Sequence, residues 1–239
     1  YPMFIHLRSY SNYSFLRGLA SPHDLVQAAV KHQMPCLGLT DYIGLSGAVE
    51  FYDACLAAGI KPILGMELRV NFSDRPTQGP WTDSPGAGSS ITLLAMNFTG
   101  WSGLCHVSSS ILNRGAPAKL AAIGINLQTL KEIFKDRMYL ELQMHAVEDH
   151  PRVLQQTQLA KRRKIPTVAT HPIHYLEPEH AGLQRVVTAI RTIRPLANLQ
   201  PGDTAPTNAY FTSQSVMKDR FAHFPQAIDN TVEVAGRCN

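Results

Sequence analysis

The residues best suited to chemistry stand where predicted strands end. Residues 4–22, FIHLRSYSNYSFLRGLASP, begin as a short apolar strand whose polar residues alternate, and alternate positions share one face of a strand. Other polar residues stand at the C-terminal ends of later predicted strands. Together the set comprises Arg8, Asp41, Tyr42, Glu67, His145 and His174. In parallel α/β architectures this edge is where active sites are built, so we expect these side chains to share one pocket.

Three members of this set are suited to metal chemistry. Glu67, His145 and His174 are the residue types of a mononuclear site with two histidines and one carboxylate. The alternative is that they are hydrogen-bonded pocket residues without a metal. His171 lies three residues before His174 and is a possible substitute ligand. No cofactor is expected, and if one binds it should be a single, weakly held zinc or manganese ion.

Alternating strands and helices are predicted to position these residues. Ser21 and Pro22 are a cap and a first-turn proline, which predict a helix at their C-terminal side. Predicted strands are CLGLT (36–40), KPILGMELRV (61–70), SITLLAM (90–96) and RMYLELQMH (137–145), with helical periodicity between several of them. Such alternation argues for parallel βαβ units, arranged either as a barrel or as a doubly wound sheet.

Bulk properties are those of an ordinary globular chain. The 239 residues carry a formal net charge of +4, and 44% are hydrophobic. The longest apolar runs are too short to span a bilayer, and we expect no secretion signal. The cysteines Cys36, Cys55, Cys105 and Cys238 are scattered, which favours free thiols in a reducing cytoplasm. The basic run KRRK (161–164) is either a solvated helix end, which we favour, or a phosphate-contacting patch.

A single domain is expected over residues 1–239, with two interruptions. Residues 71–89, rich in Gly, Pro, Ser and Asp, predict a long exposed loop. Residues 195–209 have a similar composition and predict a surface linker. Neither segment is long enough to form a second domain.

Several longer motifs follow one another along the chain in the order found in one protein family. They are HLRSYSNYSFLRGLA, MPCLGLTDYIGLSGAVEFYDACLAAGIKPILGMEL, DRMYLELQMH, IPTVATHPIHYLEPEHA and FPQAIDNTVEVAGRCN. In this arrangement the chain resembles the N-terminal polymerase-and-histidinol-phosphatase (PHP) domain of bacterial DNA polymerase III alpha subunits. The resemblance implies a distorted seven-stranded (β/α) barrel, a TIM-like fold, and a role in DNA replication. It also implies that the polymerase's catalytic aspartates would lie beyond Asn239.

The resemblance carries further expectations about partners and chain length. The expected partners are the remainder of the polymerase chain, a proofreading exonuclease subunit, and DNA through the parent polymerase, with no membrane. Polymerase relatives usually carry several tens more residues at the point where Glu132 is followed directly by Ile133 in this chain. The sequence of residues 115–125 breaks the family pattern in a similarly abrupt way. The chain is either a trimmed variant or lacks residues near this point, and the second explanation is favoured.

The metal ligands of active PHP domains are carried over one position at a time. Six ligand positions hold other residues here, namely Arg8, Tyr10, Arg17, Tyr42, Ser90 and Pro172. Three ligand positions are kept, Glu67, His145 and His174, and Asp41 remains beside Tyr42. Arginine cannot give up its proton at accessible pH, so Arg8 and Arg17 cannot bind a metal and would repel one. The implied metal-dependent hydrolysis is therefore not expected.

We therefore predict that the site is rebuilt around an ion pair. Without metals, Glu67 is a partly buried carboxylate that needs a cation, and Arg8 should supply it, with Asp41 as a second candidate partner. Tyr10 and Tyr42 should fill the remaining volume. The function favoured is a catalytically silent structural domain of a DNA polymerase. The alternatives are a residual metal-dependent phosphoesterase or 3′–5′ proofreading exonuclease, and a stand-alone binding module.

Overall fold

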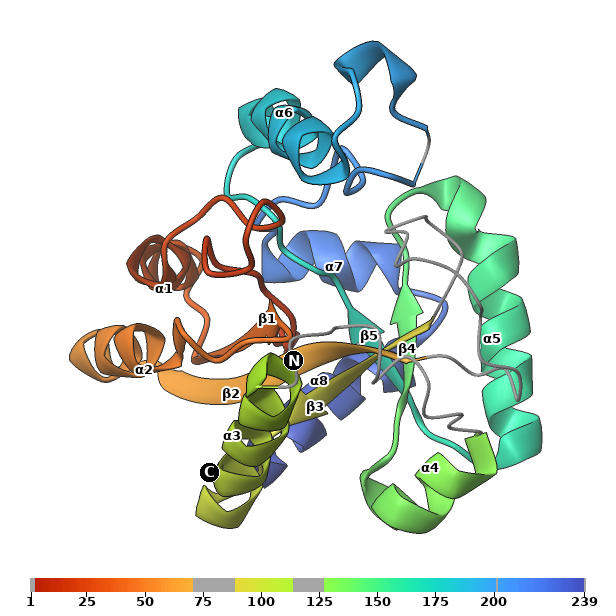
Figure 1. The fold of residues 1–239 in the computed structure, drawn as a ribbon. Coiled ribbons are helices and arrows are strands. Elements are labelled where there is room, and N and C mark those ends of the chain that lie inside the picture. Colours follow the sequence, from red (N-terminus) through yellow and green to blue (C-terminus); the bar gives the residue numbers. More distant parts are fainter. Residues whose placement is uncertain (1–2, 71–88, 114–126, 201, 239) are drawn as a thin grey trace.

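The protein has a mixed α/β fold, seen here in a computed structural model that describes residues 3–70, 89–113, 127–200 and 202–238 (Figure 1). The strands are β1 (Cys36–Tyr42), β2 (Lys61–Val70), β3 (Ser89–Leu94), β4 (Leu140–Gln143) and β5 (Thr167–Thr170). The helices are α1 (Pro22–Lys31), α2 (Ala48–Ala57), α3 (Phe98–Asn113), α4 (Leu127–Phe134), α5 (His150–Arg163), α6 (Ala181–Thr192), α7 (Gln214–Arg220) and α8 (Pro225–Arg237). Within the described part of the chain, no helix combines the length and apolarity needed to cross a membrane.

The described strands form two sheets. β1 and β2 pair in parallel, and Tyr42 is opposite Glu67 where both strands near their ends. β4 and β5 form a second parallel pair. The expectation that residues 90–96 belong to a parallel unit is wrong, because β3 runs antiparallel to β2. Val70 pairs with Ser89 in this antiparallel register.

The predicted first strand, residues 4–10, links the two sheets without forming a regular ladder. On one side it meets β1, where the amides of Gly38 and Thr40 donate to the carbonyls of His6 and Ser9 at 2.8 and 2.9 Å. On the other side the Tyr10 amide donates to the carbonyl of Ile173, just after β5, at 2.9 Å. Among the described residues no ladder joins β3 to β4. The mixed α/β fold is therefore shown, whereas closure of the barrel remains a prediction.

Helices pack against these strands through apolar faces that the sequence sets up. Ser21 caps α1 by accepting from the amide of Asp24, and Leu25, Val26 and Ala29 bury one side of the helix. They form a core with β1, α2 and Ile173. A second core joins Phe4 to β4, β5, α7 and α8. Residues 4–10 thus run between two cores, which fixes the direction of the side chains that follow Phe4.

The segments expected to interrupt the domain have different outcomes. Residues 71–88 and 115–125 lie outside the described residues. Helix α4 runs continuously through Glu132 and Ile133. Within 195–209, the residues of η5 (Leu196–Asn198) are exposed, but Asp203 and Ala209 are buried. The segment therefore alternates between the surface and the interior, where Asp203 and Ala209 pack into the domain.

Gly38 provides a test of the contact between β1 and residues 4–10. A Cβ at this position would lie 2.5 Å from the carbonyl oxygen of Leu7, which is backbone and cannot move aside. Gly38→Ala should therefore lower the free energy of unfolding by about 2–3 kcal/mol, as overpacking does. At Gly103, an exposed position of helix α3, a Cβ meets nothing within 4 Å, so Gly103→Ala should instead stabilise by about 1 kcal/mol. Urea denaturation of both variants measures this, and a neutral Gly38→Ala would contradict the predicted contact.

Candidate functional site: a buried ion pair

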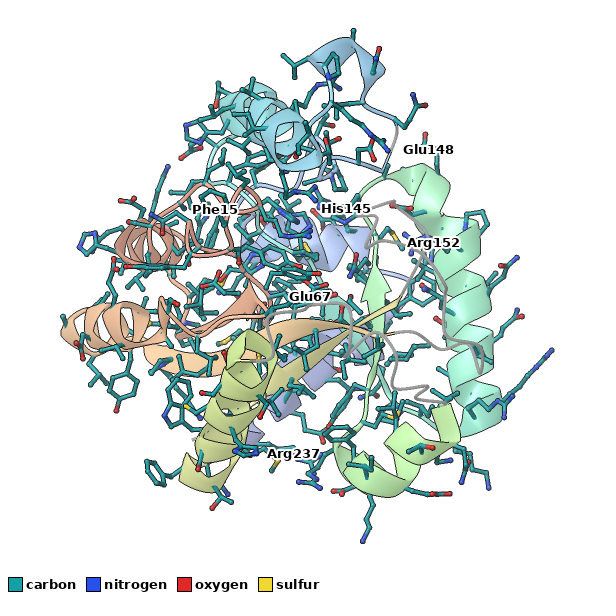
Figure 2. All side chains as sticks on the ribbon, viewed as in Figure 1. Phe15, Glu67, His145, Glu148, Arg152 and Arg237 are labelled. Atoms are coloured by element: carbon teal, nitrogen blue, oxygen red, sulfur yellow. The ribbon has the colours of Figure 1, made fainter. Side chains whose placement is uncertain are left out.

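Arg8 is the centre of the candidate site. Its side chain is only 5% exposed, and its Nη2 lies 3.1 Å from Oε1 of Glu67. The predicted pair between Arg8 and Glu67 is therefore present. Nη1 donates to Oε2 of Glu141 at 2.7 Å. Because Glu67 belongs to β2 and Glu141 to β4, one guanidinium joins carboxylates from both sheets. Figure 2 shows Glu67 in the middle of the molecule.

Glu141 was missed by the sequence analysis. It falls outside the ligand positions that the resemblance carries over, so nothing assigned it a role. A signal was nevertheless available, because a single carboxylate within the apolar strand YLELQ needs a polar partner once that strand is packed. Its Oε2 also accepts from Thr170 Oγ1 at 3.2 Å and Gln143 Nε2 at 3.1 Å.

Tyr10 completes the coordination of Glu67. Arg8 Nη2 donates to the Tyr10 hydroxyl at 2.5 Å, and this hydroxyl donates in turn to Oε2 of Glu67. Both oxygens of Glu67 are thus engaged. The ring of His174 packs against the Tyr10 ring with centroids 4.4 Å apart. Tyr10 therefore fills the space between the ion pair and His174, as expected.

The electrostatics of the cluster favour its charged form. Burial alone would raise the pKa of Glu67, but the Arg8 charge and the hydrogen bonds from Tyr10 and Ser90 outweigh burial and lower it. Burial also opposes the charge of Arg8, yet Glu141, Tyr10 and Glu67 together hold its pKa well above the ordinary value. Burial raises the pKa of Tyr10, which keeps its hydroxyl proton for Glu67.

Asp41 has other partners than Arg8. Its carboxylate accepts from the Ser11 amide at 2.7 Å and from the hydroxyls of Ser11 and Ser14 at 2.6 and 2.5 Å. The expectation that Asp41 is a second partner of Arg8 is therefore wrong. The serines of the turn after residues 4–10 satisfy this carboxylate locally, which pins the turn to the end of β1. Burial raises the pKa of Asp41.

Arg17 and Tyr42 form a separate contact beside the cluster. The Arg17 guanidinium carbon lies 3.9 Å from the centre of the Tyr42 ring, a cation–π geometry. The carbonyl of Arg17 lies 3.2 Å from Nδ1 of His174, so this nitrogen donates. Tyr42 thus packs with Arg17, and Arg17 connects it to His174.

The remaining histidines gather around His171. Its ring centroid lies 5.2 Å from that of His145 and 6.0 Å from that of His6, which packs between Phe4 and Phe211. Nε2 of His171 lies 2.9 Å from the Tyr210 carbonyl, and Arg220 donates to its Nδ1 at 3.3 Å. The three retained ligand positions are therefore split between two groups: Glu67 and His174 contact Tyr10, whereas His145 contacts His171.

The residues present do not fit the metal centre that the fold family implies. Arg8 and Tyr10 occupy both oxygens of Glu67, and a guanidinium lies where a cation would have to bind. Among the described residues, no three or more histidine, cysteine, aspartate or glutamate side chains are placed to hold a metal ion. The conflict is one of charge, since Arg8 supplies the positive charge that the carboxylates require.

A comparison with protein families shows which family this chain is related to. The PHP domain model matches residues 6–123. This chain carries a PHP domain. Curated relatives are DNA polymerase III alpha subunits, from Escherichia coli K12 at 30% identity, Pseudomonas aeruginosa at 28% and Pasteurella multocida at 27%. The matches cover 99–100% of this chain but only 22–23% of the relatives, in their N-terminal part.

The alignments also bear on chain length. The match to the Escherichia coli subunit runs over 277 positions, more than the 239 residues of this chain, so the matched part of the relative contains residues that this chain lacks. Among solved structures, an amidohydrolase from Chromobacterium violaceum with bound sulfate and no metal is 24% identical. The match covers 51% of this chain and 40% of the amidohydrolase chain. Its TM-score of 0.31 is too low to support a conclusion about the fold.

Removing Arg8 tests the ion pair. Arg8→Ala leaves two carboxylates without their cation, and should lower the free energy of unfolding by about 3 kcal/mol at pH 7. The loss should shrink as the pH falls, because without Arg8 burial raises the pKa of Glu67 and protonation then removes the unpaired charge. In the wild type the pH dependence runs the other way. The pKa of Glu67 is lowered in the folded protein, so the contribution of this carboxylate to stability is fully present above its ordinary pKa and is lost as the pH falls through the lowered pKa.

Urea denaturation of both proteins between pH 7 and pH 4 measures this difference. The matched control is Arg152→Ala, because Arg152 pairs with Asp149 at 2.8 Å on the exposed surface of α5. Such a surface pair should contribute less than about 1 kcal/mol. Equal losses for Arg8→Ala and Arg152→Ala would contradict a buried, stabilising pair.

The buried histidines predict a second pH dependence. Burial lowers the pKa of His6 and His174 to about 4 and that of His171 to about 2. The unfolded chain binds these protons from about pH 6.5 downward while the folded chain does not, so stability should fall as the pH falls below 6.5. His174→Gln should flatten this slope by about 1 kcal/mol per pH unit. Exposed His23→Gln should leave the slope unchanged, and the same slope in both variants would contradict the assignment.

Proposed function

We propose that this chain is the N-terminal PHP domain of a DNA polymerase III alpha-type subunit, acting in DNA replication as a structural domain without hydrolytic activity. Full-length alignment to the N-terminal part of these alpha subunits supports the parentage. Because the chain spans about a quarter of the relatives' length, the polymerase activity would belong to the chain beyond it. A closed (β/α) barrel of seven strands, with residues 4–10 as one member, is part of the same proposal.

The observation that carries the loss of activity is Arg8. PHP-type phosphoester hydrolysis uses metal ions to activate water and to neutralise charge on the leaving oxygen. In this chain a guanidinium neutralises Glu67 and Glu141, and it has neither an open coordination position nor a removable proton. Arg8 and Tyr10 therefore replace the metals as a structural cross-link between the sheets without replacing their chemistry.

The proposal includes partners and a compartment. The remainder of the polymerase chain is the first partner, a proofreading exonuclease subunit the second, and DNA is reached through the parent polymerase. Cys36, Cys55, Cys105 and Cys238 are free thiols, and three of them are buried, which supports the expected reducing cytoplasm. A stand-alone binding module is less well supported, because the relatives named above are long polymerase chains.

Assays of the purified chain test the proposed silence. With manganese or zinc present, neither p-nitrophenyl phosphate nor a 3′-labelled single-stranded primer should be turned over above the metal-free rate. Arg8→His should not create activity, because Tyr10 still engages Glu67 and His145 lies with His171. Metal-stimulated turnover that His174→Ala abolishes would overturn the proposal. Sequencing the gene past Asn239 tests the parentage, since a polymerase palm with catalytic carboxylates should follow.

A further inference from the structure

Helix α6 presents its apolar side to solvent. Leu183, Val186, Ile190 and Ile193, here called the outer stripe, recur at helical spacing and are 53%, 39%, 59% and 92% exposed. Leu196, in the turn that follows, is 44% exposed and extends the apolar surface. Side chains three and seven positions apart lie on one face of a helix, so the stripe is continuous.

The side of α6 that faces the domain buries two polar residues, Gln184 and Thr188, and one small apolar residue, Ala189. Gln184 and Thr188 are buried, and Gln184 Nε2 donates to Thr188 Oγ1 at 3.1 Å. An amphipathic helix ordinarily turns its apolar stripe toward the core, and this helix does the reverse. In α2, by contrast, Phe51 and Cys55 bury an apolar inner face, although Val49, Tyr52 and Leu56 are exposed. Folding of this domain accounts for α2 but gives no reason for the outer stripe of α6.

Ile193 adds a second, independent observation. It ends α6 in the left-handed conformation, with φ 53° and ψ 45°, where glycine or asparagine is usual and a branched side chain is disfavoured. At 92% exposure its side chain gains almost nothing within this domain. The conformation itself serves the end of the helix, because the Ile193 amide donates to the carbonyls of Ala189 and Ile190, but burial within this domain gives no reason for an isoleucine side chain here.

The stripe is carried by an anchored helix. Asp203 ties down its C-terminal end, since Arg194 lies 3.3 Å from the Asp203 carboxylate and Arg191 donates to the Asp203 carbonyl at 3.2 Å. Gln200 donates its amide to the same carboxylate at 2.7 Å. Figure 1 shows α6 at the edge of the molecule, away from α3 and α8. The outer stripe is therefore a preformed surface.

Charge narrows the choice of partner. Arg185, Arg191 and Arg194 flank the stripe, and residues 181–194 contain no acidic side chain. A second copy of this helix would place arginines against arginines, which opposes association. The surface that fits has an apolar centre and an acidic rim.

We propose that the outer stripe docks on such a surface in the polymerase chain that follows this domain. This inference rests on the proposed function, which places a long chain beyond Asn239. The relatives support that choice, because more than three quarters of their length lies outside the part that this chain matches. Docking would cover Leu183, Ile190 and Ile193 while the exposed Arg185 meets a carboxylate at the rim.

The test compares the 239-residue chain with the full-length protein encoded by the gene. Hydroxyl-radical footprinting should label Leu183, Ile190 and Ile193 readily in the short chain and several-fold more slowly in the full-length protein. Ile190→Glu should leave the melting temperature of the short chain unchanged and lower that of the full-length protein. Leu56→Glu on α2, an exposed apolar position on another helix, is the matched control and should change neither.

The other outcomes overturn the proposal in distinguishable ways. Equal labelling of the stripe in both proteins would show that nothing in the longer chain covers it. Concentration-dependent dimerisation of the short chain, abolished by Ile190→Glu, would assign the stripe to a second copy. Protection that appears only after another protein is added would assign it to a separate subunit. A gene that encodes no polymerase chain after Asn239 would overturn the proposed function itself and this occupant with it.

Discussion

The buried guanidinium of Arg8 holds two carboxylates from different sheets, and the arrangement around it depends on that charge. Glu67 comes from β2 and Glu141 from β4, while Arg8 comes from the extended segment that lies between the two sheets. Burial makes an unpaired carboxylate expensive, so Glu67 is not compatible with this packing unless a cation is supplied, and Glu141, which is 27% exposed, shares that cation. In a metal-dependent PHP domain that cation is a metal cluster, whereas here it is a side chain.

A side-chain cation changes what the pocket can do. Metal ions can exchange ligands and bind water, whereas a guanidinium can only donate hydrogen bonds, and here Nη1 and Nη2 of Arg8 are engaged by Glu141, Tyr10 and Glu67. Tyr10 lies beside Arg8 and donates a hydrogen bond to Glu67, and His174 packs on the Tyr10 ring. His145, which stands at a ligand position, lies instead with His171 and His6. The pocket is thus filled by neutral rings and a salt bridge, which suits a structural role.

Sequence reasoning reached the parts of this account that depend on local pattern. The capped helix after Ser21 and the parallel pair of β1 and β2 follow from capping and periodicity. The pairing of Arg8 with Glu67 was predicted from the family resemblance, which places both residues at metal-ligand positions, together with the cost of a buried charge. It missed Glu141, because that residue occupies no ligand position of the family. It also missed the serine partners of Asp41, because the fold of the turn at Ser11 and Ser14 decides them. The reversal of β3 was hidden by the length of the segment before it.

The orientation of α6 shows a further limit of pattern reading. Periodicity identifies an apolar stripe but does not say which way it faces, and the ordinary expectation that it faces the core fails here. That orientation depends on polar contacts around Asp203, which lie outside the helix. When the folding of a domain does not explain why an apolar side chain is exposed, the explanation has to be looked for in what that side chain contacts outside the domain.

The central claim is that Arg8 occupies the place of the metals. It is tested most directly by a crystal structure of the chain grown with millimolar manganese and analysed by anomalous diffraction. The account predicts the Arg8 guanidinium within hydrogen-bond distance of both Glu67 and Glu141, with no anomalous peak between Glu67 and His174. A manganese peak at that position, with the guanidinium displaced from the carboxylates, would contradict it.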